Sequence, residues 1–313
     1  MKASWPDIPY TAWSETCSAL HLYCQIVGKY RLARTPWVNH SWHATFYVNA
    51  RGLTTGLVPD GPAGGIEVVL DLLGHELVVM SSDGRTGRLP LLAGSVAGFH
   101  RRFRSLLVDM GANPEFSGVP NEVPGGVPFA EDDAVRPYDA EAVSRFFHAL
   151  VQVDRVLKLF RTSFLGKVSP VHLFWGSFDL AVTRFSGRVA PLLPGGVPAL
   201  PDKVTCEAYS HQVSSAGFWP GGGGVDYPAF YSYAYPAPEG FSEAGVKPAA
   251  ARFDTALGEF ILPYEDVRLS GDPDRALMEF LESTYRAAAD LGGWDTGMLE
   301  CGTGWPLHPR PVG

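Results

Sequence analysis

Residues 139–184 read DAEAVSRFFHALVQVDRVLKLFRTSFLGKVSPVHLFWGSFDLAVTR, and this stretch decides the fold class. Its first part carries apolar residues three and four positions apart, the period of one helix face: Phe146, Leu150, Val153, Leu157 and Phe160. Its last part, Val171–Arg184, alternates between two sets of side chains, as a β-strand does. We therefore predict a helix that starts at Asp139 and is followed by a long strand.

The same pattern occurs 133 residues earlier. The apolar helical stripe there consists of Trp13, Cys17, Leu20, Cys24 and Val27. An alternating stretch, Asn39–Arg51, follows it. The offset persists without a gap through the turn and maps Trp42 onto Trp175. Self-similarity of this kind indicates an internal duplication. We expect the two long strands to lie in one continuous or pseudo-twofold sheet.

Other segments complete the predicted α+β fold, an antiparallel sheet with helices segregated to one side and two pseudo-repeated halves. Ile66–Leu73 and Glu76–Ser81 flank Gly74-His75 and predict a hairpin. A helix is expected near the end of each half, at Ser95–Met110 and at Asp274–Leu291.

The predicted boundaries follow from composition. Residues 1–120 form the first half, 121–138 a connector rich in Pro, Gly and acidic residues, 139–295 the second half, and 296–313 a tail. The second half carries about 40 extra residues between positions 188 and 247, with four consecutive glycines and many aromatic residues. Long loops in compact domains are usually functional. We expect this insertion to border the main pocket.

Composition bounds the function. The 313 residues carry 25 Lys and Arg against 33 Asp and Glu, a net charge of −8, so a global basic footprint for nucleic acid is absent. No apolar stretch approaches the length of a membrane span. The first ten residues lack the apolar core of a signal peptide. The sequence predicts a soluble, cytoplasmic protein with a small-molecule ligand and with neither nucleic acid nor membrane as a partner.

Three stretches carry a resemblance to a known family: PWVNHSWH at 36–43, GKVSPVHLFWGSFD at 166–179, and SHQVSSAGFWPGG at 210–222. Together they resemble the bacterial family catalogued as domain of unknown function 5996. The resemblance runs from Trp5 to about Asp295 and implies a single conserved module. It implies no activity, cofactor or partner.

Histidines are the first candidate site residues. His40 and His43 are three apart, so on a strand they point to opposite faces and cannot chelate one ion without a bulge. His43 and Arg51 lie on the same face of the predicted strand. This face is either one wall of a ligand-binding site or exposed surface. His172, at a strand entrance, is a candidate ligand or acid–base group, or a structural histidine. A divalent metal held by His43, His172 and His211 is one possible cofactor.

Acid–base candidates are Glu207, His211 and Asp179. Glu207, Tyr209 and His211 alternate along Val204–Ser215, which on a strand would place them on one face. One interpretation is a site that transfers protons or binds a metal. The other is a row of polar side chains on an exposed strand. Asp179, expected in mid-strand between apolar neighbours, must be paired or have a raised pKa. It is a site candidate, the best carboxylate partner for His211, or half of a structural ion pair.

Aromatic residues offer a binding surface. Tyr231, Tyr233 and Tyr235 alternate, so they share one strand face, and Trp219 could join them. This is a stacking platform for a flat ligand or sugar, or a core edge with wet hydroxyl groups. The sequence favours an enzyme that acts on a small molecule, by His/carboxylate acid–base chemistry or through a bound metal. A small-molecule or carbohydrate binding module without catalysis is the alternative.

Overall fold

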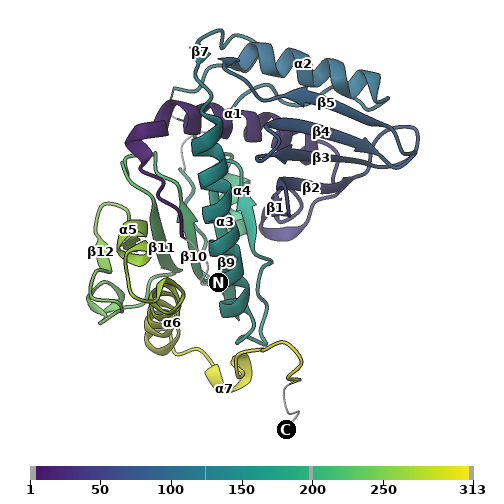
Figure 1. The fold of residues 1–313 in the computed structure, drawn as a ribbon. Helices are drawn as coiled ribbons and strands as arrows, with labels where there is room; N and C mark the ends of the chain where they lie inside the picture. Colours follow the sequence, from purple (N-terminus) through teal and green to yellow (C-terminus); the bar gives the residue numbers. More distant parts are fainter. Residues whose placement is uncertain (1–4, 124, 197–199, 310–313) are drawn as a thin grey trace.

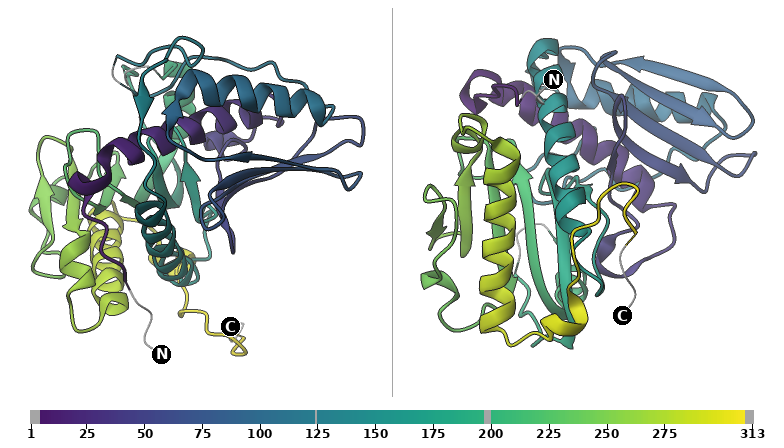
Figure 2. Two further views of the ribbon diagram at one scale, coloured as in Figure 1. Left: turned by 45° about the horizontal axis from the view of Figure 1, so that its top comes forward. Right: turned by 60° about the horizontal axis from the view of Figure 1, so that its bottom comes forward.

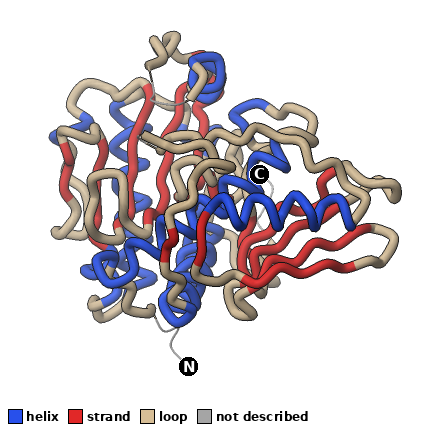
Figure 3. Tube along the Cα trace, turned by 90° about the horizontal axis from the view of Figure 1, so that it is seen from above, coloured by secondary structure: helices blue, strands red, loops and turns tan. Residues whose placement is uncertain are grey.

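The computed structural model describes residues 5–123, 125–196 and 200–309 (Figure 1). The first half begins with helix α1 (Tyr10–Leu32). An antiparallel sheet follows, with its strands side by side in chain order: β1 (Tyr47–Val48), β2 (Gly52–Val58), β3 (Ile66–Asp71), β4 (Glu76–Ser81) and β5 (Thr86–Pro90). Helix α2 (Val96–Asp109) then lies along this sheet (Figure 3).

The second half repeats this order of elements. Helix α3 (Ala140–Arg161) comes first and helix α6 (Pro273–Leu291) follows the last strand. Between them is an antiparallel sheet in the order β12–β13–β11–β10–β9–β8. Its strands are β8 (His172–Phe174), β9 (Asp179–Val189), β10 (His211–Trp219), β11 (Ala229–Tyr235), β12 (Arg252–Asp254) and β13 (Glu259–Pro263). Helices α3 and α6 run side by side over one face of this sheet (Figure 2).

Short elements connect the main ones. They are the 3₁₀ turns η1 (Asn39–Ser41) and η2 (Phe241–Glu243), the paired strands β6 (Gly94–Ser95) and β7 (Val135–Arg136), and helices α4 (Asp202–Ala208), α5 (Tyr264–Arg268) and α7 (Thr296–Leu299). The α+β class is confirmed, and so are the hairpin at β3 and β4 and the helices predicted from apolar periodicity. Ser95 and Asp139 cap the N-termini of α2 and α3, because their side chains accept hydrogen bonds from backbone N–H groups of the first turn.

The two sheets meet edge to edge. Phe46, just before β1, and Leu173 of β8 exchange backbone hydrogen bonds of 2.9 and 2.8 Å. The ungapped offset of 133 makes β1 equivalent to residues 180–181 of β9, and it makes the turn η1 equivalent to strand β8. The offset therefore does not extend into the strands. The halves share an order of helix, antiparallel sheet and helix, and their duplication stays a prediction.

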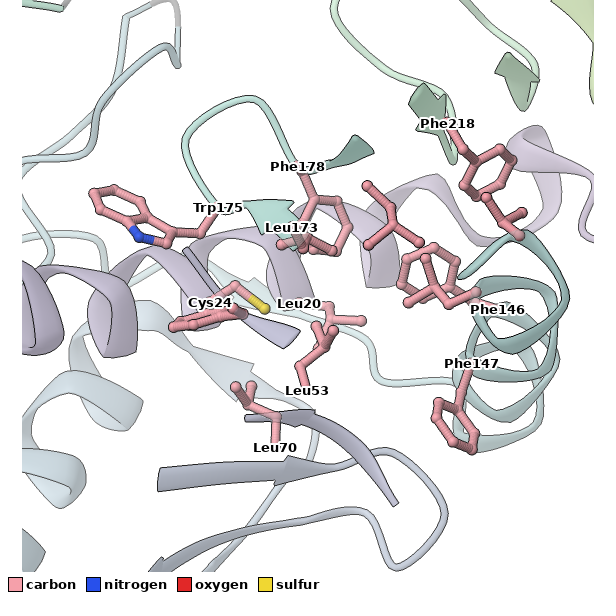
Figure 4. Packing of buried hydrophobic residues seen from close by; sticks show 14 of the residues in the cluster. Leu20, Cys24, Leu53, Leu70, Phe146, Phe147, Leu173, Trp175, Phe178 and Phe218 are labelled. Carbon is pink, nitrogen blue, oxygen red and sulfur yellow. The ribbon is translucent and has the colours of Figure 1, made fainter. Parts of the chain in front are cut away.

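One hydrophobic core joins the halves. Figure 4 shows Leu20 and Cys24 of α1 between Leu53 and Leu70 of the first sheet and residues of the second half. Trp13 of α1 packs against Phe146 of α3 with ring centroids 5.2 Å apart. Because both leading helices contribute to the same core, the halves hold each other in a fixed orientation.

The predicted long strands are both interrupted. Asn39–Arg51 is wrong as a strand, because His40 and Ser41 have left-handed φ angles of 61° and 58° and form a tight turn. Tertiary contacts hold this turn: His40 Nδ1 donates to the Ala208 carbonyl, 3.0 Å away. Val171–Arg184 breaks at residues 175–178, where Phe178 has a φ of 61°. Its ring stacks on His21 of α1, with centroids 5.0 Å apart.

Candidate functional site

A pocket of about 710 Å³ lies on the face of the second sheet opposite α3 and α6. Strand alternation creates it: Asp179, Ala181 and Thr183 of β9 line the pocket. The next residues along β9, Leu180, Val182 and Arg184, are buried on the helix-covered face, where Arg184 donates to the Phe160 carbonyl of α3. Residues of η1, α4 and the segment 117–122 also line the pocket. Both halves of the chain therefore contribute to it.

Asp179 is one of three carboxyl residues in the lining. It is 4% exposed, and its carboxyl accepts hydrogen bonds from the hydroxyls of Ser177 and Tyr231. Burial raises the pKa of Asp179, and these two hydrogen bonds oppose the rise. Sequence reasoning was right that this carboxyl is paired or shifted. It was wrong about the position, which is the first residue of β9 rather than mid-strand, and about His211 as the partner, since Ser177 and Tyr231 pair with this carboxyl.

Glu122 enters the pocket from the connector. Its φ is 56°, and its carboxyl lies so close to Gly176 that a Cβ there would overlap Oε1. Glycine at position 176 leaves room for this approach, whereas a larger residue would make the end of the Glu122 side chain move. Burial, reinforced by the Asp179 carboxyl and opposed by Lys29, raises the pKa of Glu122 to about 7. The Glu122 carboxyl therefore gains and loses its proton close to neutral pH.

Among the described residues that line the pocket, Lys29 of α1 is the one whose side chain can carry an ammonium group. It is 6% exposed, its Nζ donates to Asn121 Oδ1, and it lies 5.7 Å from the centre of the Trp175 ring. Burial lowers the pKa of Lys29 to about 8, and Glu122 opposes the shift. Lys29 and Glu122 therefore both titrate close to neutrality.

Glu259 completes the set of carboxyl groups. It is the first residue of β13 and reaches the pocket from the strand beyond β11. Burial, reinforced by Asp179 and Asp254, raises the pKa of Glu259 to about 8. Its Oε2 is buried and has no hydrogen-bond partner among the residues that the structure describes. A buried, unsatisfied carboxyl oxygen is costly unless it is protonated or met by a ligand.

Aromatic rings form one wall of the pocket. Trp219, the last residue of β10, stacks on Tyr231 with centroids 4.3 Å apart, and Tyr231 and Tyr233 follow at 6.1 Å with nearly parallel planes. Gly217 makes room, since a Cβ there would lie within 2.6 Å of the Tyr231 ring. The predicted platform is therefore present for Trp219, Tyr231 and Tyr233. Tyr235 does not line the pocket, and its hydroxyl donates to the Pro191 carbonyl at 3.0 Å.

Glu207 and His211 do not share a strand face, and neither lines the pocket. Glu207 lies in helix α4, where it accepts a 2.7 Å hydrogen bond from the Trp37 indole, and His211 is the first residue of β10. The predicted strand Val204–Ser215 is wrong over Val204–Ala208, because Pro201 followed by Asp202 starts a helix there. It is right over His211–Ser215, which lie in β10. Tyr209, at the end of α4, does line the pocket and donates to Tyr233 at 3.1 Å.

The predicted metal ligands are not brought together. Within residues 5–123, 125–196 and 200–309, no three His, Cys, Asp or Glu side chains are placed to hold one metal ion. His172 is buried, it contacts Thr45 at 3.1 Å, and burial lowers its pKa to about 3. His43 is buried outside the pocket lining, with Nδ1 accepting from the Val38 amide at 3.1 Å.

The predicted binding wall of His43 and Arg51 does not form. Arg51 lies in the turn before β2, and its guanidinium pairs with Asp71 at 2.6 Å. His40, by contrast, does line the pocket. Its Nδ1 donates to Ala208 and its Nε2 accepts from Lys167 Nζ at 2.6 Å. Burial lowers the pKa of His40, so the neutral ring is favoured.

The predicted insertion at 188–247 does contribute Tyr209, Trp219, Tyr231 and Tyr233 to the lining. It is more than a loop, because it contains strands β10 and β11 of the sheet itself. The four consecutive glycines, 221–224, lie outside the lining. Gly221 packs against the ring of Tyr10, so this glycine run turns the chain beside α1.

Residues 5–301 match the family of unknown function DUF5996, nearly the whole chain. The chain belongs to this family. No curated protein and no solved structure matches the chain. In the part of this DUF5996 protein that the structure describes, no helix is both long and apolar enough to cross a bilayer.

Sequence reasoning missed three pocket residues of this DUF5996 protein: Lys29, Glu122 and Glu259. A signal for one of them existed. His21, Gln25 and Lys29 are spaced by four on α1, so they form a polar stripe on a mostly buried helix. His21 bonds the carbonyl oxygens of Trp175 and Gly176 at 3.0 and 2.9 Å. Gln25 holds the backbone of Asn121 through bonds of 2.7 and 2.8 Å. The stripe thus positions both segments that bring Glu122 to the pocket.

Proposed function

We propose that this DUF5996 protein is an enzyme that acts on a small organic molecule and uses carboxyl groups of the pocket to transfer protons. One observation carries the proposal. Glu122, Asp179 and Glu259 come from distant parts of the sequence, line one pocket, and all have raised pKa values. Raised carboxyl pKa values in a cleft are typical of acid–base sites.

Each carboxyl is suited to a different role. Glu122, with a pKa of about 7, can accept or donate a proton at neutral pH, where general acid–base catalysis is most efficient. Glu259, with a pKa of about 8, is mostly protonated at pH 7 and is suited to donate. Asp179 is fixed by Ser177 and Tyr231. It interacts electrostatically with both glutamates and so raises their pKa values.

Binding in the proposed site comes from the aromatic wall. Trp219 and Tyr233 are the two ends of a stack around Tyr231, and both line the pocket. Aromatic faces bury a large apolar area and orient a flat or cationic group. The same wall supports the second candidate function, a binding module without catalysis. The difference is whether the bound molecule is changed.

A substrate screen tests the proposal. Purified protein is incubated with mixtures of small metabolites, and mass spectrometry follows which molecule disappears and which product forms. We expect turnover by the wild type and by Glu131→Gln, which changes an exposed carboxyl in the same connector as Glu122. Glu122→Gln should lose at least about 100-fold in rate, the usual size of a general acid–base contribution.

Two results would count against catalysis. A molecule that binds in the pocket and is recovered unchanged favours the binding module. Turnover that is equally fast with Glu122→Gln would show that proton transfer does not depend on this carboxyl.

A further inference from the structure

The lining of the pocket is acidic. With every group ionised, the described lining holds three carboxylates and the ammonium group of Lys29, while burial favours the neutral ring of His40. Lys167 is not in this lining but lies against the rings of Trp42 and Phe185. In an apolar cavity this excess of negative charge is unfavourable, and protonation relieves it. A positively charged ligand would relieve it as well, and it would supply a partner for the buried Glu259 Oε2.

Three aromatic rings of the lining already lie next to lysine ammonium groups. Lys29 Nζ lies 5.7 Å from the centre of the Trp175 ring. Lys167 Nζ lies 5.3 Å from that of Trp42 and 4.8 Å from that of Phe185. All three rings line the pocket. No described Lys or Arg side chain is stacked in this way on Trp219 or Tyr233, the ends of the aromatic stack.

The size of the cavity bears on the kind of cation. The three carboxyl groups line a pocket of about 710 Å³ and, within the described ranges, are not placed to share one metal ion. Pockets of this volume take molecules of the size of metabolites. A cation that reaches both the carboxyl groups and the aromatic wall is therefore an organic one.

We propose that the ligand of this pocket is an organic cation, a molecule whose alkylated or primary ammonium group lies between the carboxyl groups of Glu122, Asp179 and Glu259 and the ring faces of the aromatic wall. The inference rests on the proposed function for the location of the site. It adds the chemical class of the substrate. Ammonium groups over aromatic rings are attracted by the ring quadrupole, and nearby carboxylates strengthen the attraction.

The titration of the pocket gives this proposal a distinctive pH dependence. As pH rises from 6 to 9, Glu122 and Glu259 become ionised and Lys29 becomes neutral, so all three changes favour a permanent cation. Other titratable groups that face these residues come from η1, α4, β9, β11 and β12: His40, Tyr209, Asp179, Tyr231, Tyr233 and Asp254. The tyrosine pKa values are raised by burial, so these phenols stay neutral over this range.

Calorimetric titration with choline and with its neutral isostere 3,3-dimethylbutan-1-ol tests the charge alone, since the two probes have nearly the same shape. We expect choline to bind at least about tenfold more tightly at pH 8, and its affinity to rise at least about tenfold from pH 6 to pH 8.5. Glu259→Gln should reduce this rise and Glu131→Gln should not. Thermal unfolding confirms that each variant is folded.

Further probes separate failure of the ligand class from failure of the site. Suppose that maltose or the neutral isostere binds as tightly as choline and that Trp219→Ala abolishes this binding. The pocket is then still the binding site, but the proposal that its ligand is an organic cation is overturned. Binding of Zn²⁺ alone that depends on Glu259 would also overturn it. Choline affinity that is unchanged in both Trp219→Ala and Glu259→Gln would reject the pocket as the site. Absence of binding by choline and by 1,4-diaminobutane at millimolar concentration would overturn the proposal.

Discussion

Replacing Glu122 or Glu259 by glutamine should stabilise the folded chain at pH 8, relative to the wild type, and leave its stability nearly unchanged at pH 4. Both pKa values are raised in the folded state, from 4.5 to about 7 and to about 8. The unfolded chain therefore releases these protons at lower pH than the folded chain does. The stability that they contribute is fully present below pH 4.5 and is lost as pH rises through the folded-state pKa values.

The expected size of this effect is on the order of 3 kcal/mol at pH 8 for either carboxyl, since one pKa unit corresponds to about 1.4 kcal/mol. The two effects are not additive, because both glutamates interact with Asp179. Glutamine keeps the shape of the side chain and stays neutral. Urea unfolding from pH 4 to pH 9 measures the difference between each variant and the wild type, with Glu131→Gln as the exposed control.

A variant that is less stable than the wild type at pH 8 would contradict the assignment, because it would show that the ionised carboxyl is favoured in the folded chain. A difference that does not change with pH would contradict it as well. In that case the glutamate would titrate in the folded chain as it does in the unfolded chain.

Asp179→Asn should reduce turnover by about 100-fold or more while the fold is retained. Asparagine keeps an oxygen that can accept the Tyr231 hydroxyl and removes the negative charge at the centre of the pocket. The Asp179 charge helps to raise the pKa values of both Glu122 and Glu259, so its removal should lower them. The pH dependence of the remaining activity should therefore shift to lower pH.

Rates from pH 5 to pH 9, measured on the molecule that the substrate screen identifies, check this prediction. Tyr231→Phe is the matched comparison, because it removes one hydrogen bond to Asp179 and keeps the ring stack with Trp219. It should cost less activity than Asp179→Asn. Unchanged rate and pH profile in Asp179→Asn would show that this carboxyl is structural.

Elements with strong local patterns could be predicted from the sequence. Apolar residues at helical spacing gave α1 and α3 in outline, and the alternation of tyrosines gave β11 and the aromatic wall. In these segments the side chains that set the pattern also make the packing contacts. Local preference and tertiary environment therefore agree.

The failures occurred where tertiary contacts override a local pattern. The alternation of Asn39–Arg51 predicts a strand, yet the bonds of His40 to Ala208 and Lys167 belong to a left-handed turn. The site itself is assembled from residues 122, 179 and 259, and of these only Asp179 stood out in the sequence, as a carboxyl between apolar neighbours. Glu122 lies in the connector, and it reaches the pocket only because α1 holds Asn121 and because residue 176 is glycine.

The proposed chemistry requires the pocket carboxyls to exchange protons near neutral pH. Carbon-13 NMR of a chain labelled at the side-chain carboxyls of glutamate, titrated from pH 3 to pH 10, measures this directly, and Glu122→Gln and Glu259→Gln assign the two signals. We predict midpoints at about 7 for Glu122 and about 8 for Glu259. Midpoints near the ordinary value of 4.5 for both residues would contradict the account.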